Sequence, residues 1–144
     1  MAMTGTENAT AQWSTLPRNP PRFDTDRFMV LPLQPDKARD LLGVLLCDGK
    51  LAAQLPWMPD KSVDGARAEA FLAEMRCAAG TDLVWGIVER ARGAYIGAVI
   101  VRDSLEGLDV EVLCASQFFG QGVADEAGEP VMAWLEEVVE VELV

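Results

Sequence analysis

A loop with two glycines is the part of this sequence best suited to chemistry. It reads Gln117-Phe-Phe-Gly120-Gln-Gly122-Val-Ala124 and comes directly before a segment with helical periodicity. Glycines at a strand-to-helix turn let backbone N–H groups point outward without obstruction by a Cβ atom. Together with a helix N-terminus, such amides form a site for a phosphate or pyrophosphate. A helix-entry turn with tight packing is the alternative interpretation of the same glycines.

This loop differs from two familiar kinds of phosphate loop. No Gly-Lys-Ser/Thr follows the glycines, which excludes a loop of the Walker type. The spacing is not that of a Rossmann fingerprint, and the strand before the loop belongs to a meander rather than opening a βαβ unit. What remains is a pyrophosphate loop without a lysine, in which backbone amides bind the anion.

The composition excludes several other kinds of site. None of the 144 residues is histidine, so the chain has no His-based triad, no imidazole general base and no metal site that contains histidine. With 12 Lys+Arg against 23 Asp+Glu the formal charge is -11, which argues against binding to nucleic acid or to an anionic membrane surface. Half of the residues are hydrophobic, as in one globular domain.

The cysteines and the N-terminus indicate a cellular compartment. Cys47, Cys77 and Cys114 are an odd set of thiols without a CxxC pair, which favours a reducing environment over a disulfide framework or a zinc site. The first residues have no basic region followed by an apolar one, so they do not resemble a secretory signal. No apolar run approaches the ~18 residues that a membrane span needs. We therefore expect a cytoplasmic protein without a metal ion.

The elements that must position the loop follow from the hydrophobic pattern. Residues 1–22, rich in Thr, Asn and Pro, are predicted to be a flexible lead-in to a single domain at 23–144. That domain is predicted to run β-α-α-β-β-β-α-β. Pro35 begins the first helix, and Ser62 caps the second, which ends before Gly80. The strands are expected at 28–33, 83–88, 95–101, 108–113 and 138–144, and the last helix at 122–137.

Apolar spacing indicates how these elements pack. The first helix is expected to bury Leu41, Leu42, Leu45 and Leu46, and the second Ala66, Ala70, Phe71 and Met75. The three middle strands form an antiparallel meander, and alternation at Val139, Val141 and Leu143 predicts a last strand that joins by a parallel, right-handed crossover. The expected fold is therefore α/β (α+β), with a mixed, mostly antiparallel central sheet flanked by helices.

Beyond these patterns, the loop resembles the Q/R-x-x-G-x-G/A signature of the GNAT superfamily of acetyl-CoA-dependent N-acetyltransferases. The resemblance covers residues 23–144. It is nearest to the branch that acetylates the N-termini of ribosomal proteins. It extends to the opening strand Thr25–Leu33, to Gln54-Leu-Pro-Trp57 after the first helix, and to Trp85-Gly-Ile-Val and Tyr95-Ile-Gly97 in the central hairpin.

The resemblance implies a cosubstrate, acetyl-CoA, and an amine acceptor as the second substrate. The amides of Gln121, Gly122, Val123 and Ala124, with Gln117 and Gly120 nearby, would hold the pyrophosphate. The strand end Val112-Leu113-Cys114 would pair with the pantetheine arm and polarise the thioester carbonyl. A primary amine would then attack directly, without a covalent enzyme intermediate or a metal.

Four side chains near this expected site have two interpretations each. Glu111 could accept the proton of the amine, directly or through water, or it could be a solvent-facing strand glutamate. Cys114 fits buried packing better than chemistry. Trp57 and Trp85 could line the amine pocket or belong to the core. Tyr95 is the only tyrosine, so no late tyrosine is available as a general acid.

The sequence departs from the family pattern near its end. Family members continue with another helix and two strands that are not expected here, and Pro130 should kink or break the first turns of the last helix. Three interpretations follow. The chain is an N-acetyltransferase, completed by a homodimer through its last edge strand; or it is a catalytically degenerate module that binds acyl-CoA or a protein; or it is a truncated reading frame without an evolved role.

Overall fold

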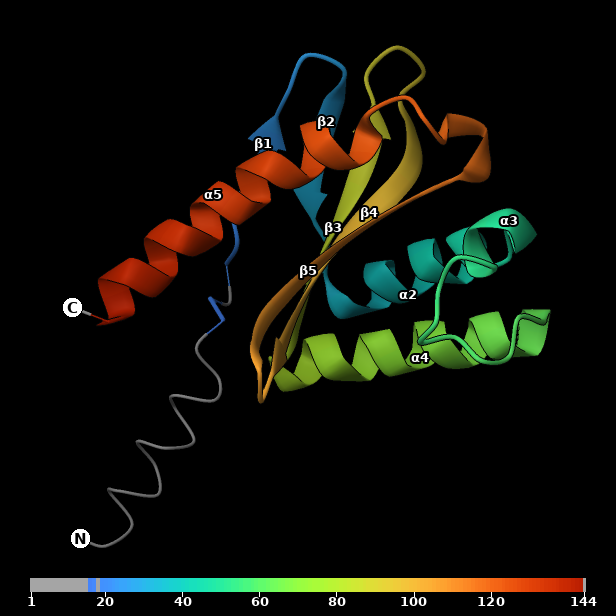
Figure 1. The fold of residues 1–144 in the computed structure, drawn as a ribbon, viewed down its shortest axis with the longest axis horizontal. Helices are drawn as coiled ribbons and strands as arrows, with labels where there is room; N and C mark the ends of the chain where they lie inside the picture. Colours follow the sequence, from blue (N-terminus) through green and yellow to red (C-terminus); the bar gives the residue numbers. More distant parts are fainter. Residues whose placement is uncertain (1–15, 18, 144) are drawn as a thin grey trace, which may run out of the picture.

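The computed structural model describes residues 16–17 and 19–143 of the chain, with side chains placed up to Val138. Short strands come first, helices follow, and the meander of β3, β4 and β5 leads to the last helix (Figure 1). The elements in chain order are β1 (Phe23–Asp24), β2 (Phe28–Pro32), α2 (Pro35–Leu45), α3 (Gly49–Ala52), α4 (Val63–Ala79), β3 (Asp82–Glu89), β4 (Ala94–Ser104), β5 (Gly107–Cys114), the 3-10 turn η1 (Ser116–Phe118) and α5 (Val123–Leu143).

The sheet lies between two helical layers. Its five strands follow one another in chain order, β1-β2-β3-β4-β5, and every neighbouring pair is antiparallel. Helices α2 and α4 lie side by side on one face, and α5 crosses the other (Figure 1). The predicted class, an α/β fold whose mostly antiparallel sheet is flanked by helices, is confirmed.

Each face of the sheet has its own hydrophobic core. The core under α2 and α4 includes Leu42 and Leu45 from α2 and Ile100 and Leu113 from the sheet. The core under α5 gathers Phe28, Trp85 and Val99 around Val131. The alternation of side chains along β3, β4 and β5 therefore divides their residues between the two cores.

The two predicted N-terminal helices are confirmed in place, with one error in their packing. Ser62 accepts a hydrogen bond from the Gly65 amide, and Gly80, with φ 83°, ends α4. Ala66 and Ala70 are buried as expected, but Phe71 and Met75 are 46% and 52% exposed. The reason is close packing through small residues, since a Cβ at Gly43 of α2 would lie 3.9 Å from that of Ala70. Larger side chains are left outside, and the Arg39 guanidinium covers the Phe71 ring at 5.2 Å.

The predicted last strand is wrong. Residues 138–143 continue α5, so the described sheet has no parallel crossover, and the edge strand proposed for dimer formation does not form. Apolar residues at 127, 131, 135 and 138 follow a helical period, and no Gly, Pro, Asn or Asp after Pro130 ends the helix. Pro130 lies inside α5, which continues through it, so the predicted break is also wrong. Because Pro130 has no N–H, the helix lacks one backbone hydrogen bond there.

The middle of the chain matches its predicted hairpin and meander. Strands β3 and β4 pair from Asp82↔Arg102 to Glu89↔Ala94, with a register shift at Ile87/Val88. Strand β5 pairs with β4 from Gly97↔Cys114 to Ser104↔Gly107. A Cβ at Gly97 would collide with the carbonyl oxygen of Leu113, so glycine is required for the close approach of these strands.

The predicted lead-in at 1–22 falls largely outside the described residues. Of its described part, Leu16 is buried, and the Pro21 carbonyl accepts a 2.8 Å hydrogen bond from Trp85 Nε1. This part contacts the core beneath α5. In the described ranges, 16–17 and 19–143, no helix combines the length and the apolar character needed to cross a membrane.

Candidate functional site

An open groove of about 450 Å³ lies where the end of β5 meets the N-terminus of α5. One wall comes from α3 and the residues after it, another from β5, and the third from the glycine loop and the first turn of α5. The lining residues are Leu51, Gln54, Leu55, Glu111, Val112, Leu113, Cys114, Phe118, Phe119, Gly120, Gly122, Val123, Ala124 and Asp125.

The glycine loop has the backbone geometry of an anion site. Gly120 and Gly122 have φ of 78° and 75°, in the left-handed region that favours glycine. The buried Phe118 anchors the loop, and its carbonyl accepts the Gln121 amide at 3.2 Å. Helix α5 begins at Val123, so the N–H groups of its first turn have no partner within the helix. These amides are available to an anion at the groove.

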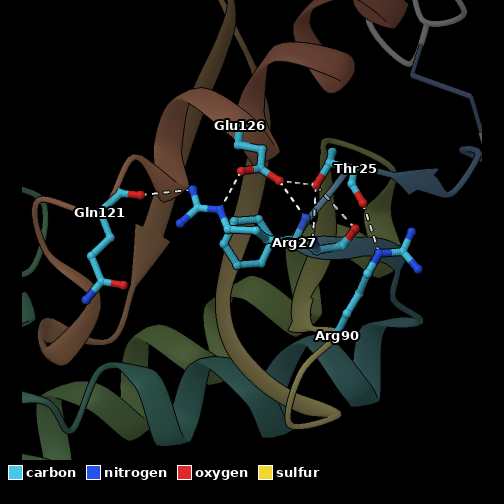
Figure 2. Close-up of polar contacts among 6 residues, drawn as sticks. Thr25, Arg27, Arg90, Gln121 and Glu126 are labelled. Atoms are coloured by element: carbon cyan, nitrogen blue, oxygen red, sulfur yellow. Dashed lines mark hydrogen bonds and ion pairs between the residues drawn. The ribbon is translucent and has the colours of Figure 1, made fainter.

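A network of polar contacts fixes this loop from the side of the β1–β2 turn (Figure 2). Arg27 Nε donates to Glu126 Oε1 at 2.7 Å, and Arg27 Nη2 donates to the carbonyl oxygen of Gln121 at 2.9 Å. Glu126 Oε2 accepts from Thr25 Oγ1 at 2.6 Å and from the Arg27 amide at 2.9 Å. Residues nearly a hundred positions apart thus hold the first turn of α5 in place.

The Glu126 carboxylate is stabilised in its charged form. Partial burial acts to raise its pKa, but the hydrogen bonds from Thr25 and Arg27 and the Arg27 charge outweigh it, so the pKa of Glu126 lies below its usual value. Glu126 is therefore a charged anchor for Arg27 at neutral pH.

Glu111, the predicted proton acceptor, is held by two donors. Its Oε1 accepts from Arg102 Nη1 at 2.8 Å, and its Oε2 accepts from Trp57 Nε1 at 3.0 Å. The Arg102 guanidinium also stacks over the Trp57 ring at 4.9 Å. Glu111 faces the core beneath α2 and α4 rather than open solvent, and it reaches the groove lining.

The end of β5 is tied to the short helix α3. Asp48 caps α3 through Lys50 and Leu51, and its other carboxylate oxygen accepts the Ser116 amide at 2.7 Å. The Ser116 hydrogen bond is the main reason that the pKa of Asp48 is lowered. Burial, and secondly the Asp48 charge, raise the pKa of the Cys114 thiol. Cys114 is therefore protonated at neutral pH and unsuited to be a nucleophile.

The structure brings together most of the predicted site residues. Glu111, Val112, Leu113 and Cys114 share the groove with Gly120, Gly122, Val123 and Ala124. Gln117 and Gln121 do not line it, because the Gln121 side chain turns back to donate to the Gln117 carbonyl at 3.2 Å.

The two tryptophans predicted for the amine pocket lie elsewhere. Trp85 has no exposed surface and packs against Trp134 at 5.7 Å in the core beneath α5, so its assignment to the pocket is wrong. Trp85 lies on β3, paired with Pro32 of β2 and Val99 of β4, and its side chain faces the core beneath α5. Trp57 does not line the groove itself but contacts it through the hydrogen bond to Glu111.

Sequence reasoning missed several residues that shape the site. Arg27 and Glu126 support the loop, Arg102 and Asp48 hold its neighbours, and Asp125 lines the groove. The one signal of these residues in the sequence was the acidic pair in the first turn of α5, because acidic side chains stabilise the N-terminus of a helix. Of the described residues that line the groove, the charged ones are Glu111 and Asp125, and none is basic.

Comparison with known proteins agrees with this geometry. Residues 27–144 match the family model described as "Acetyltransferase (GNAT) domain". No significant match was found among curated proteins.

Two solved structures show the similarity in fold. One is a ribosomal-protein-S5-alanine acetyltransferase from Vibrio fischeri, with TM-score 0.57, 14% identity, and 82% of this chain and 68% of that chain covered. Another is a GNAT-family acetyltransferase from Bacillus anthracis, with TM-score 0.60, 9% identity, and 83% and 69% covered. The match of the family model over most of the sequence, with the groove at the loop that carries the signature, shows that this chain belongs to the GNAT acetyltransferase family.

Proposed function

We propose that this protein transfers an acetyl group from acetyl-CoA to a primary amine, on a protein N-terminus or a small molecule, by direct attack of the amine. The observation that carries this proposal is the groove itself. It places an edge strand, a glycine loop and a helix N-terminus around one space, in a chain of the GNAT family. Membership of the family supports acetyl transfer in general, and the groove supports the choice of site.

The backbone supplies the binding groups. The amides around Gly122, Val123 and Ala124 bind the pyrophosphate of the cosubstrate. Strand β5 has no strand partner on its outer side among the described residues, so the N–H and C=O groups that point outward, at Val112 and Cys114, are free to pair with the pantetheine arm. An amide at this strand end also stabilises the charge that develops on the thioester oxygen.

Glu111 is the carboxylate best placed to receive the proton that the amine must lose. It lies on β5 and borders the groove, within reach of an acceptor or of an intervening water. Trp57 and Arg102 orient it, and Arg102 compensates its charge. Cys114, kept protonated, contributes packing rather than a covalent step.

A second function is favoured by one observation, namely that both oxygens of Glu111 already accept hydrogen bonds. Each carboxylate oxygen then has one lone pair fewer open to the proton of an amine. The alternative is therefore an acyl-CoA-binding or protein-interaction module without catalysis.

A two-step experiment tests the proposal. Acetyl-CoA is first titrated in a thermal-shift assay, in which a ligand that binds only the folded state must raise the melting temperature. Release of free CoA thiol is then measured with a panel of primary amines. A shift with amine-dependent thiol release supports the transferase. A shift without release supports the binding module, and no shift at saturating acetyl-CoA contradicts both.

A further inference from the structure

Arg27 contacts the glycine loop from the side away from the groove. Its Nη2 donates to the Gln121 carbonyl, while Arg27 itself is not among the lining residues. Figure 2 shows the guanidinium between Gln121 and Glu126. The side chain is 45% exposed, and a Cβ at Gly122 would lie 3.7 Å from Nη2. Arg27 is thus adjacent to the loop without taking part in the groove surface.

The hydrogen bond to Gln121 determines where the Gly122 amide points. No cis peptide bond occurs among the described residues, so the peptide between Gln121 and Gly122 is trans and planar. Its N–H group is then antiparallel to its C=O group. Because Arg27 holds the Gln121 oxygen on its own side, the Gly122 N–H is directed to the opposite side of the loop, and Gly122 borders the groove.

The same arginine also controls charge at the helix N-terminus. Asp125 and Glu126 place two carboxylates in the first turn of α5, where an anionic ligand would be repelled. Glu126 turns toward Arg27 and Thr25 with three hydrogen bonds, one of which is also its ion pair with Arg27, and it does not line the groove. A charge-assisted bond to the Gln121 carbonyl further polarises the peptide and strengthens the Gly122 N–H as a donor.

We propose that Arg27 is a positioning residue for the cosubstrate. By bridging Glu126 and the Gln121 carbonyl, it orients the Gly122 amide toward the pyrophosphate of an acyl-CoA that it does not itself touch. This inference rests on the proposed function, since it assumes that the loop binds a pyrophosphate.

The decisive variant is Arg27→Lys. A lysine keeps the positive charge beside Glu126, but its single ammonium group cannot reproduce the fork of a guanidinium that donates to two partners. We expect CoA to bind about tenfold more weakly to R27K, and at least as weakly to R27Q. Pantetheine, which has no pyrophosphate, should bind R27K as it binds the wild type. Calorimetric titration of both ligands measures this difference, which general damage to the fold would not produce.

Arg90→Gln is the matched control. Arg90 comes from the neighbouring hairpin, where its Nε donates to the Thr25 carbonyl at 2.9 Å and Nη2 pairs with Asp24 at 3.4 Å, but it contacts neither Gln121 nor Glu126. R90Q removes one guanidinium charge, as R27Q does, and it should bind CoA like the wild type. In addition, the NMR chemical shift of the Gly122 amide should change in R27K and stay unchanged in R90Q. This measurement reports the peptide directly, even where R27Q does not fold.

The outcomes separate the two proposals. If the wild type does not bind CoA, the proposed function fails and the role of Arg27 fails with it. If the wild type binds and R27K binds equally well, only the positioning role is overturned. An equal loss of affinity for CoA and for pantetheine in R27K would also overturn the positioning role, because it would indicate disruption of the whole groove.

Discussion

Glu111 is held in one orientation by two donors, Trp57 from the loop between α3 and α4 and Arg102 from β4. If it receives the proton of the amine, Glu111→Gln removes the base while keeping a similar shape. We expect kcat to fall about 10²-fold or more, with little change in the affinity for acetyl-CoA. Steady-state kinetics with the best amine of the panel and a binding titration make the comparison.

Asp109→Asn is the control for this substitution. Asp109 lies two residues away on the same face of β5, is 68% exposed and approaches Arg102 only at 3.8 Å. D109N should leave kcat within about twofold of the wild type, as expected for a weak surface ion pair. A normal kcat in E111Q would show that another group accepts the proton.

Gly122 has a positive φ and also lines the groove. Its substitution should therefore change both the stability of the fold and the binding of the ligand. Gly122→Ala should destabilise the fold by about 1 kcal/mol, because an L-residue is strained in the left-handed region. It should also abolish most of the thermal shift with acetyl-CoA, because the peptide between Gln121 and Gly122 would rotate to relieve that strain. Urea denaturation and the thermal-shift titration measure the two effects.

Gly93 supplies the matched variant, because it has φ 65° and open space around its Cβ position, in the β3–β4 turn far along the chain from the loop. Gly93→Ala should destabilise the fold by a similar amount and leave the ligand-induced shift intact. Equal loss of the shift in G93A and G122A would mean that the loop is not the binding site.

At the scale of elements, the β1–β2 turn and α5 are joined by the contacts of Thr25 and Arg27 with Glu126. The folded-state pKa of Glu126 is lowered, so its contribution to stability is present above its unfolded pKa of about 4.3 and is lost as pH falls through the folded value. Glu126→Gln should therefore be less stable than the wild type by about 1 kcal/mol at pH 7.

This difference between wild type and E126Q should shrink as the pH is lowered below about 4. Urea denaturation at several pH values follows it, with Glu136→Gln, an exposed position on the same helix, as the reference. A difference that stays constant with pH would show that the charge of Glu126 does not link the two elements.

Sequence patterns predicted the elements that have clear local signals. Ser62 and Gly80 bracket α4, and the glycine between the two apolar runs of the hairpin marks its turn. The end of α5 was misassigned because its valines fit both the period of two of a strand and the period of a helix. The segment is helical because it extends a helix that is already formed and packed on the sheet. The exposure of Phe71 was missed because it depends on how closely α2 approaches, which no local pattern contains.

The candidate site was predictable only in its backbone part. The glycines and the strand end were found because they are contiguous in sequence. Arg27 and Asp48 act on residues 94 and 68 positions away in the sequence, and Arg102 acts across the β4–β5 pair. The contacts of Arg27 and Asp48 become visible only when the β1–β2 turn and the start of α3 are placed beside the loop and the end of β5.

For the whole molecule, the formal charge of -11 bears on the binding of both proposed substrates. The groove follows the same trend, since its described charged residues are Glu111 and Asp125. An acidic protein attracts a cationic amine and repels an anionic cosubstrate. On the proposed function, the binding of CoA depends on short-range amide contacts that overcome a repulsive field.

Salt should therefore strengthen the binding of CoA to this protein. The Debye length falls from about 30 Å at 0.01 M salt to about 10 Å at 0.1 M, so added salt screens the repulsion between the phosphates and the acidic molecule. We expect the Kd of CoA to fall a few-fold over this range, as measured by calorimetric titration. Uncharged pantetheine should show no such dependence. Asp125→Asn, which removes one of the two carboxylates that line the groove, should tighten the binding of CoA at low salt and reduce the dependence of Kd on salt. A Kd that rises with salt would instead require a cation in contact with the phosphates, and Arg27 would then be a ligand-binding residue rather than a positioning one.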